Sequence, residues 1–262
     1  MNDLGLVSIS FRSLTPEQII CAVKEAGLTC IEWGSDVHAP CNDPAKLIEV
    51  ARLMRAAGVK CCSYGTYFKL GVDPLEALLP YIQAAKLLGT NILRLWCGTK
   101  ASLDYTPQER AELYAQCRAA AAMAEEHGVT LCMECHNWYI TDRKESALEL
   151  MQAVDSPAFR MYWQPNQFFT PEENLAYLRL LSPYITHIHV FNWTSEAWVG
   201  KDLLPPPGVM PEMYPLKEAV SLWQQYLQCV PNHHALLLEF MPDDRVESLP
   251  VEAAALKEIV GE

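Results

Sequence analysis

Acidic, imidazole and amide side chains stand at or just after the ends of four separate predicted strands. They are Glu134 in TLCMECH, Gln164 in RMYWQPN, His189 in THIHVFN and Glu239 in LLLEFM. Each of these strands is followed by a helical pattern. In a parallel barrel all strand ends gather at one rim, so residues far apart in the sequence converge there. Two carboxylates, a histidine and an amide at one rim suit a single hard divalent cation.

The two glutamates are flanked by apolar residues, so burying them is costly unless they are paired or ligate a metal. The competing interpretation is a buried ion pair with Arg or Lys, and basic residues are scarce on these strands. A metal-binding or catalytic role is therefore favoured. His189 alone would be a hydrogen-bonded core histidine, but its place beside two glutamates favours a ligand. Glu32 and Arg94 also lie inside strand patterns, where a buried pair is at least as well supported as a substrate role.

The elements that must position these residues alternate between short β-rich runs and longer amphipathic runs. The predicted strands are LGLVSISF, CIEWG, KCCSYGTYF, NILRLWCG, TLCMECHN, FRMYWQPN, ITHIHVFNW and HALLLEFM. Helices are predicted over residues 15–27, 43–58, 74–89, 106–128, 142–154, 170–181, 215–229 and 244–260. The first helix shows the usual signals, with Thr15 as N-cap, Pro16 in the first turn and Gly27 as the stop.

Eight strand–helix units that close on themselves predict an α/β fold, a single (β/α)₈ TIM barrel domain over residues 1–262. An open doubly wound sheet is the structural alternative. It normally carries a glycine-rich phosphate turn after an early strand, and SFRSLTPE contains no glycine. The longest irregular segment, residues 192–215 after the seventh strand, is expected to overhang the rim that carries the site.

Composition limits the classes of function and partner. Half of the 262 residues are hydrophobic, a fifth are charged and the formal net charge is −12, which disfavours binding to a nucleic-acid backbone. No apolar run is long enough to span a membrane, and MNDLGLVSIS lacks the features of a secretory signal. A cytoplasmic location is therefore expected. The ten cysteines are expected to be free thiols, because several lie in or beside predicted buried strands.

Aromatic and histidine residues near the strand ends are candidate substrate contacts. Trp96 and Trp193 could stack on the apolar face of a sugar or simply cap the core, and the sequence supports both equally. His136 lies just past Glu134, at the rim, where it could touch a substrate.

Five short motifs carry a resemblance that covers nearly the whole chain. They are IEWG with Asp36-Val37-His38, LRLW, MECH, HIHV and LLLEF, in that order. In this order and at these barrel positions they resemble the xylose-isomerase-like TIM barrels. That superfamily of sugar phosphate isomerases and epimerases includes tagatose 3-epimerase, hydroxypyruvate isomerase, inosose dehydratase and AP endonucleases. The three-metal, histidine-rich site of the endonucleases has no counterpart in this sequence.

The resemblance implies a Mn²⁺ or Mg²⁺ site formed by Glu134, Gln164, His189 and Glu239. It also implies that the two glutamates act as the acid/base pair, and that His38 is the rim histidine that contacts substrate. The chain departs from the family at the sixth strand, where the family has Asp followed three residues later by His. Here the residues are Gln164-Pro165-Asn166-Gln167, so the ligand charge falls by one and the cation is expected to bind more weakly. Gln167 then takes the place of the second substrate histidine.

The function expected from this pattern is a metal-dependent isomerase or epimerase. It would act on a small sugar or related hydroxy-carbonyl compound by removing an α-proton to give an enediolate. Two alternatives stay open: a lyase like inosose dehydratase, and a degenerate carbohydrate-binding barrel without catalysis. The expected partner is a small-molecule sugar substrate, with no nucleic acid and no membrane, and the sequence leaves a homo-oligomer open.

Overall fold

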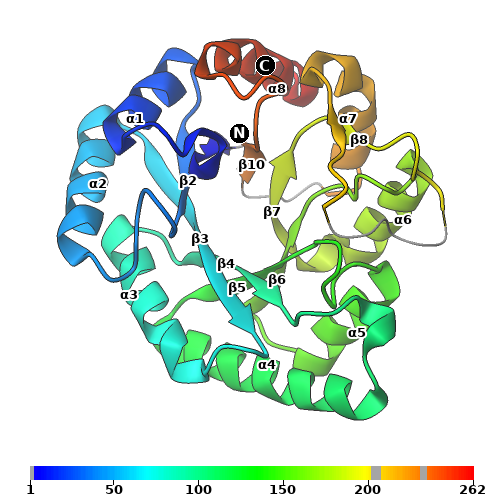
Figure 1. The fold of residues 1–262 in the computed structure, drawn as a ribbon. Coiled ribbons are helices and arrows are strands. Elements are labelled where there is room, and N and C mark those ends of the chain that lie inside the picture. Colours follow the sequence, from blue (N-terminus) through cyan, green and yellow to red (C-terminus); the bar gives the residue numbers. More distant parts are fainter. Residues whose placement is uncertain (1–2, 202–207, 231–234) are drawn as a thin grey trace.

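A computed structural model describes residues 3–201, 208–230 and 235–262. Within them, eight parallel strands close into a barrel in the order β1-β10-β7-β6-β5-β4-β3-β2, which confirms the predicted TIM barrel (Figure 1). The barrel strands are β1 (Asp3–Val7), β2 (Cys30–Gly34), β3 (Lys60–Leu70), β4 (Ile92–Cys97), β5 (Thr130–Glu134), β6 (Phe159–Trp163), β7 (Ile185–Val190) and β10 (Ala235–Leu238).

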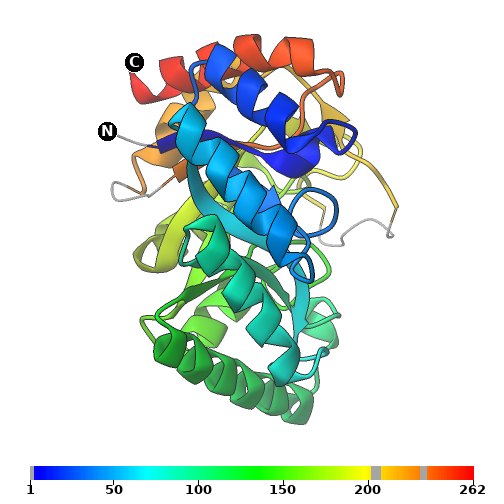
Figure 2. The same ribbon diagram turned by 90° about the vertical axis from the view of Figure 1, so that its left-hand side faces the viewer.

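Eight α-helices of the described chain form the outer layer around the strands. They are α1 (Pro16–Glu25), α2 (Pro44–Ala57), α3 (Leu79–Leu88), α4 (Pro107–His127), α5 (Lys144–Val154), α6 (Pro171–Leu181), α7 (Val220–Leu227) and α8 (Leu249–Val260). Figure 2 shows α1, α2 and α3 lying side by side on the outside of the barrel. The predicted helix ranges are confirmed to within a few residues, except that the segments expected to begin at 74, 215 and 244 start with short 3₁₀ turns.

Five predicted strands, the first and the fifth to eighth, end three or four residues earlier at the rim than expected, and the first and the last show a local cause. The first ends at Val7, and Ser8–Phe11 forms a 3₁₀ turn. The last ends at Leu238, because Phe240 adopts a positive φ of 57° that an extended strand does not allow. The Phe240 amide instead donates a hydrogen bond of 2.8 Å to the Ser10 hydroxyl, which ties the two shortened ends together. The predicted start of the last strand at His234 lies outside the described residues.

Alternation along the strands divides the apolar side chains into two groups. Side chains such as Leu131, Met133 and Ile188 join the large core between the strands and helices. The side chains that point to the barrel interior form a second, smaller cluster that includes Cys132, Tyr162 and Leu237. Since strand residues two apart share a face, the interior also receives the charged residues at the rim ends of these strands.

The segment after β7 is not wholly irregular. It contains a two-stranded antiparallel ribbon of β8 (Trp193–Thr194) and β9 (Glu212–Met213), in which Trp193 pairs with Met213. Residues 202–207 of this segment lie outside the described residues. The ribbon holds the two ends of the long loop together at the rim side of β7.

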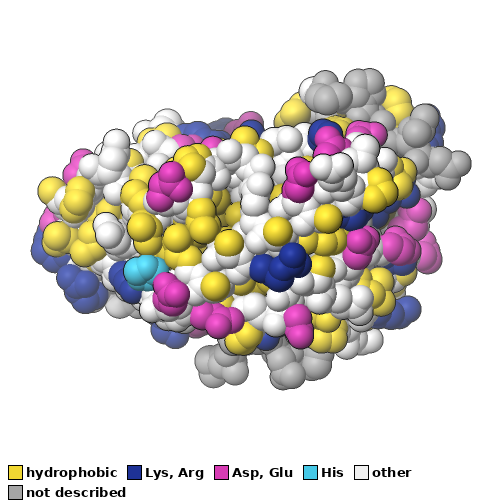
Figure 3. Space-filling view, turned by 90° about the horizontal axis from the view of Figure 1, so that it is seen from below, with side chains coloured by type: hydrophobic (Ala, Val, Ile, Leu, Met, Phe, Trp, Pro, Cys, Tyr) yellow, Lys and Arg dark blue, Asp and Glu magenta, His cyan; other side chains and the backbone are white. Residues whose placement is uncertain are grey.

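The surface and the cysteines agree with the composition. On the described part of the face in Figure 3, acidic and basic side chains are interspersed. No helix in the described ranges is long and apolar enough to cross a membrane. All ten cysteines are free thiols, as predicted.

The cap of α6 fixes the loop that follows β6, so we expect it to contribute measurably to stability. Thr170 accepts a hydrogen bond from the Glu173 amide (3.2 Å), and the Glu173 carboxylate accepts one from the Thr170 amide (2.7 Å). Thr170→Ala should lower the free energy of unfolding by about 1 kcal/mol, measured by urea denaturation. Thr170→Ser keeps the hydroxyl and is the matched control, and equal losses in the two variants would contradict a capping role.

Candidate metal centre at the barrel rim

Four strand ends bring the predicted residues to one place. Glu134 is the last residue of β5, His189 is the next-to-last of β7, and Gln164 and Glu239 directly follow β6 and β10. Parallel pairing sets their levels: Glu134 lies beside Tyr162 in β6, and His189 lies beside Leu237 in β10. All four side chains are buried, so the convergence expected from the strand order is present in the structure.

His189 Nδ1 lies at the middle of the group. It is 3.0 Å from Gln164 Oε1, 3.3 Å from Glu239 Oε2 and 3.6 Å from Glu134 Oε1. Glu134, His189 and Glu239 each offer a ligand atom within 4.8 Å of the others, and no other group of three such residues in the described chain does so. The donor set combines two carboxylate oxygens, one imidazole nitrogen and one amide group.

The spacing of these atoms suits a hard divalent cation. Oxygen ligands about 2.1 Å from a Mg²⁺ ion and at right angles to each other lie about 3.0 Å apart. The contacts of His189 Nδ1 with Gln164 and Glu239 are close to that spacing, and the Glu134 oxygen is only slightly farther away. The residues present therefore fit a bound divalent cation without a large rearrangement.

Arg94 from β4 shapes the same site from its other side. Its guanidinium donates to Glu32 Oε1 (2.8 Å) and to Glu134 Oε2 (2.7 Å), and all three residues are buried. The predicted Glu32–Arg94 pair is therefore present. The ion pair that was the less favoured alternative for Glu134 is also present, because Arg94 reaches it from the neighbouring strand. Glu134 thus binds the guanidinium with one oxygen and faces the candidate centre with the other.

Charge around the group is strongly unbalanced. Glu32, Glu134 and Glu239 supply three carboxylates, and Arg94 contributes a single guanidinium to balance them. Burial alone would lower the pKa of His189, but the surrounding carboxylates, with Glu239 first, raise it well above its usual value. The site therefore attracts positive charge, which either a proton on His189 or a bound cation can provide.

His189 is oriented by its surroundings. Its Nδ1 faces the candidate ligands, while Nε2 points toward Glu32 Oε1 at 3.7 Å. The Tyr162 ring packs against the imidazole with the ring centroids 4.6 Å apart. A carboxylate behind a histidine is the usual outer partner of a metal-binding imidazole. Glu32 stands in that position, although the distance exceeds that of a direct hydrogen bond.

The residues predicted to bind substrate lie in three different settings. The Trp96 indole donates to Glu134 Oε2 (2.5 Å), so it is part of the centre itself. Trp193 stacks on Phe191, with the ring centroids 4.0 Å apart. His38 is 1% exposed, and its two ring nitrogens contact the Ser8 hydroxyl and the Leu14 carbonyl, each at 3.2 Å. His38 therefore has no free ring nitrogen to offer a substrate in this arrangement.

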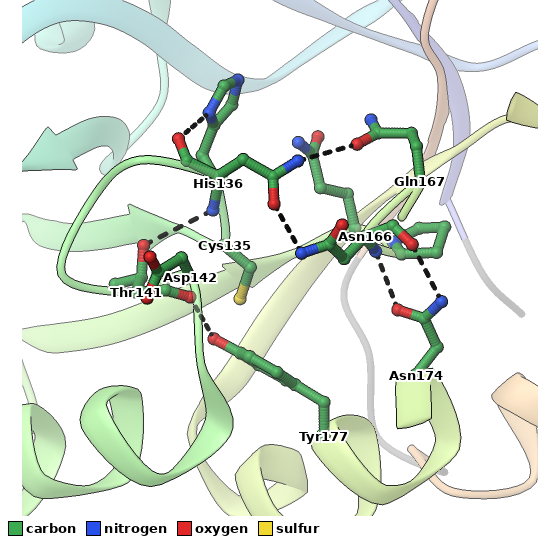
Figure 4. A pocket seen from close by; sticks show the side chains of 11 residues that line it. Cys135, His136, Thr141, Asp142, Asn166, Gln167, Asn174 and Tyr177 are labelled. Carbon is green, nitrogen blue, oxygen red and sulfur yellow. Dashed lines mark hydrogen bonds between the residues drawn. The ribbon is translucent and has the colours of Figure 1, made fainter. Parts of the chain in front are cut away.

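His136 keeps one ring nitrogen available. Its Nδ1 lies 2.9 Å from the Asn137 carbonyl, which can only accept, so Nδ1 carries the proton (Figure 4). In the neutral ring Nε2 is then an acceptor. The imidazole contacts the rings of Trp96 and Tyr139, at centroid distances of 6.0 and 5.4 Å. His136 thus lies next to the residue that binds Glu134, as expected for a rim position.

Sequence reasoning missed an amide network that joins the loops after β5 and β6. Asn166 donates to Asn137 Oδ1 (2.5 Å), and Asn137 donates to Gln167 Oε1 (3.2 Å), as Figure 4 shows. The side-chain oxygen of Asn174 in α6 accepts a hydrogen bond from the backbone N–H of Asn166 (2.7 Å). These residues line a small pocket together with His136 and Gln164. Asn137 directly follows His136, and Asn166 stands two residues after Gln164. This closeness to predicted site residues was the signal available in the sequence.

Comparison with known proteins places this geometry in a family. Residues 20–210 match the family described as xylose isomerase-like TIM barrel. A 3-dehydroshikimate dehydratase of Bacillus anthracis is 26% identical over 178 residues, which cover 64% of this chain. The match spans 62% of that relative's length.

Solved structures share the fold along the whole chain. The probable 3-DHS dehydratase of Bacillus anthracis involved in petrobactin synthesis superposes with a TM-score of 0.79 at 21% identity, covering 99% of both chains. D-psicose 3-epimerase with D-tagatose from Clostridium cellulolyticum H10 gives a TM-score of 0.67 at 14% identity, covering 99% of this chain and 98% of that one. At these identities the likeness concerns the fold.

The Glu134–Arg94 pair makes stability depend on acid pH. Burial alone would raise the pKa of Glu134, but the Arg94 guanidinium lowers it from 4.5 to about 2. A carboxyl group whose pKa is lower in the folded state stabilises the protein when the pH is above its unfolded-state pKa. This stabilisation is lost as the pH falls from 4.5 toward 2. We expect the unfolding free energy of the metal-free protein to fall through that window in urea titrations.

Glu134→Gln is the control for this titration. It should be less stable at neutral pH, because Arg94 loses a buried partner, and its stability should fall less between pH 4.5 and 2. The same pH slope in both proteins would contradict the assignment.

Proposed function

The chain belongs to the xylose isomerase-like TIM barrel family, and on that premise we propose that it is a lyase. It would remove water from a cyclic hydroxy ketone that carries a carboxylate, a compound of the 3-dehydroshikimate class. The observation that carries this proposal is the buried group of Glu134, His189 and Glu239 with Gln164 beside it. The dehydratase relative supports elimination rather than isomerisation as the outcome.

Glu134, Gln164, His189 and Glu239 would hold the divalent cation, Mn²⁺ or Mg²⁺. When bound, such a cation supplies a Lewis acid that draws charge from a substrate carbonyl oxygen and eases loss of the α-proton. The protein's own part is to hold two carboxylate oxygens and one imidazole nitrogen close together. Their burial shields this charge from water, which strengthens every electrostatic contact within the site.

We assign the role of base to Glu239, because its carboxylate has no arginine partner. Glu134 Oε2 accepts from both Arg94 and Trp96, and the guanidinium lowers the pKa of this carboxyl to about 2. The Glu239 carboxylate instead faces His189 and Gln164, and neither side chain is an arginine or lysine. Glu239 can therefore take up the α-proton more readily than Glu134, which mainly holds charge and position.

Dehydration breaks a C–H bond and a C–O bond and forms a C=C double bond and the O–H bond of water. Glu239 takes the α-proton, the electrons of that C–H bond form the new double bond, and the neighbouring C–O bond breaks. The departing hydroxide takes up the proton from Glu239 and leaves as water, which restores the carboxylate. The acceptor Nε2 of His136 can receive a hydrogen bond from a substrate hydroxyl and so fix the ring in place.

The rim offers a cation for the substrate carboxylate. Lys69 Nζ lies 6.0 Å from the centroid of the Trp96 ring, and that indole donates to Glu134. Arg12 lies nearby and donates to Tyr67 (2.8 Å), but its guanidinium is already paired with Asp36 (2.9 Å). In a chain of net charge −12, the Lys69 ammonium next to the centre favours an anionic substrate.

The second candidate is the isomerase or epimerase acting on a small sugar. The observation that favours it is that Glu134 Oε1 and Glu239 Oε2 both face the Gln164 amide, each 3.2 Å from it. Two carboxylates at one centre can remove a proton from a carbon and return one to its other face. This reaction shares its first step with dehydration, so proton exchange alone does not separate the two.

One experiment tests both candidates. The protein with Mn²⁺ is incubated in deuterated buffer with 3-dehydroshikimate and, separately, with a panel of ketoses and aldoses. We expect ultraviolet absorbance of a conjugated product from 3-dehydroshikimate, and a loss of at least about 100-fold in rate for Glu239→Gln. Glu247→Gln, on an exposed side chain, is the matched control. Deuterium uptake into sugars without a conjugated product would favour the epimerase, and no exchange in any compound would favour the binding barrel.

Removing the rim ammonium should affect binding more than turnover. If Lys69 pairs with the substrate carboxylate, Lys69→Gln should raise KM by about 10-fold or more, since a charge-assisted hydrogen bond is lost. Its kcat should change little, and Lys69→Arg should restore most of the affinity. Lys86→Gln, on the exposed face of α3, is the control. An unchanged KM in Lys69→Gln would contradict the anion-binding role.

A further inference from the structure

We propose that the side-chain amide of Gln164 takes the place of the divalent cation in the metal-free protein. A cation and the amide N–H groups would then compete for the same carboxylates. This inference rests on the proposed metal centre, and it is independent of which substrate is used. It assigns to Gln164 a role that the aspartate implied by the family resemblance could not fill.

The contacts of the Gln164 amide carry the proposal. With its oxygen turned inward, the amide faces His189 Nδ1 at 3.0 Å. The same inner position lies 3.2 Å from Glu134 Oε1 and 3.2 Å from Glu239 Oε2. An oxygen there is repelled by two carboxylates. A nitrogen there, with a His189 proton on the Nε2 that faces Glu32, donates its two N–H groups to the two carboxylates, so the reversed amide satisfies Glu134 and Glu239 without a cation.

The local backbone holds the Gln164 side chain at the group. Gln164 follows β6 directly, precedes Pro165 and is 6% exposed. Cys135 donates its backbone N–H to the carbonyl of Tyr162 (2.9 Å), which holds the ends of β5 and β6 together. The side chain therefore remains inside the group in both states, and only a half-turn of its terminal amide exchanges oxygen for nitrogen.

Charge explains why an amide can do this and a carboxylate cannot. The group already holds the three buried carboxylates of Glu32, Glu134 and Glu239, and its one guanidinium, that of Arg94, pairs with the first two. An aspartate at position 164 would add a fourth buried carboxylate, and the group would then need a cation to remain folded. The neutral amide adds no charge and supplies two donors. The metal-free site is then complete in itself.

Cation binding must undo this arrangement. To ligate, the amide must turn its oxygen inward and give up both N–H contacts with the carboxylates. Part of the binding free energy is used for this exchange, so the apparent affinity is lower than that of the same cage with an aspartate. A protein built in this way is stable without metal and loads it only when the cation is abundant.

The test compares three proteins by thermal unfolding, in EDTA and with Mn²⁺, and by calorimetric titration of Mn²⁺. Native protein should have the highest Tm in EDTA and a small rise with Mn²⁺. Gln164→Asp should have a lower Tm in EDTA, a larger rise with Mn²⁺ and at least about 10-fold tighter binding. Gln164→Met, which has a similar shape but no N–H donors, should have a lower Tm in EDTA and no tighter binding.

Controls keep the outcome interpretable. Gln225→Asp adds the same charge on the exposed face of α7 and should leave the Mn²⁺ affinity close to native. If Gln164→Asp does not fold without metal, Gln164→Met still tests the donor role. A second measurement uses the side-chain amide signals of Gln164 in ¹⁵N NMR. They should exchange slowly with water in EDTA and shift on addition of Mg²⁺.

The proposal is overturned if both variants are as stable as native protein in EDTA, or if Gln164→Asp binds Mn²⁺ no more tightly. None of these readouts uses a substrate. A protein that shows the expected pattern but exchanges no deuterium would refute the proposed enzyme and leave the role of Gln164 standing. The reverse result would refute only the role of Gln164.

Discussion

Three buried carboxylates around one imidazole are the constraint on which the site depends. Like charges at this separation and burial repel strongly, and the fold must supply compensating positive charge or hydrogen-bond donors. The barrel does so on two sides. Arg94 neutralises Glu32 and one oxygen of Glu134, while His189 and Gln164 face the remaining oxygens of Glu134 and Glu239. Arg94 and Trp96 thus hold one oxygen of Glu134, while its other oxygen and Glu239 Oε2 lie on the side where the donor set fits a cation.

This division makes the two glutamates chemically different, although both stand at strand ends. Glu134 is fixed by a guanidinium and an indole, which keeps it ionised and holds its direction. Glu239 is held by the histidine and the amide. In the proposed reaction, proton transfer needs a carboxylate whose charge is not already neutralised, so the environment favours Glu134 as the holding residue and Glu239 as the reacting one. The same division of roles would serve an elimination or an epimerisation, since the two proposed reactions share their first step.

The sequence predicted the fold and the convergence of the four residues well, because both follow from strand order. Eight alternating units have one common closed arrangement, and parallel strands place all their ends at one rim. The second partner of Arg94 could not be predicted in this way. It depends on the reach of a long side chain across the β4–β5 pairing, where Arg94 lies beside Cys132. The contacts made by loop side chains were harder still to predict from the sequence. His38 turns inward to Ser8 and Leu14, and Asn137 meets Asn166, because loop paths are set by hydrogen bonds that no periodicity records.

The departure at position 164 is informative for the same physical reason. The aspartate implied there by the family resemblance would add a negative charge that needs a positive one to balance it. With Gln164, the donors needed to hold Glu134 and Glu239 together belong to the chain itself. Stability of the barrel is then separated from occupancy of the site, and the ligand count is kept while one negative charge is removed. Such a centre binds the cation more weakly, but the protein is stable without it. The amide makes both states possible, because it presents either an acceptor or two donors from one position.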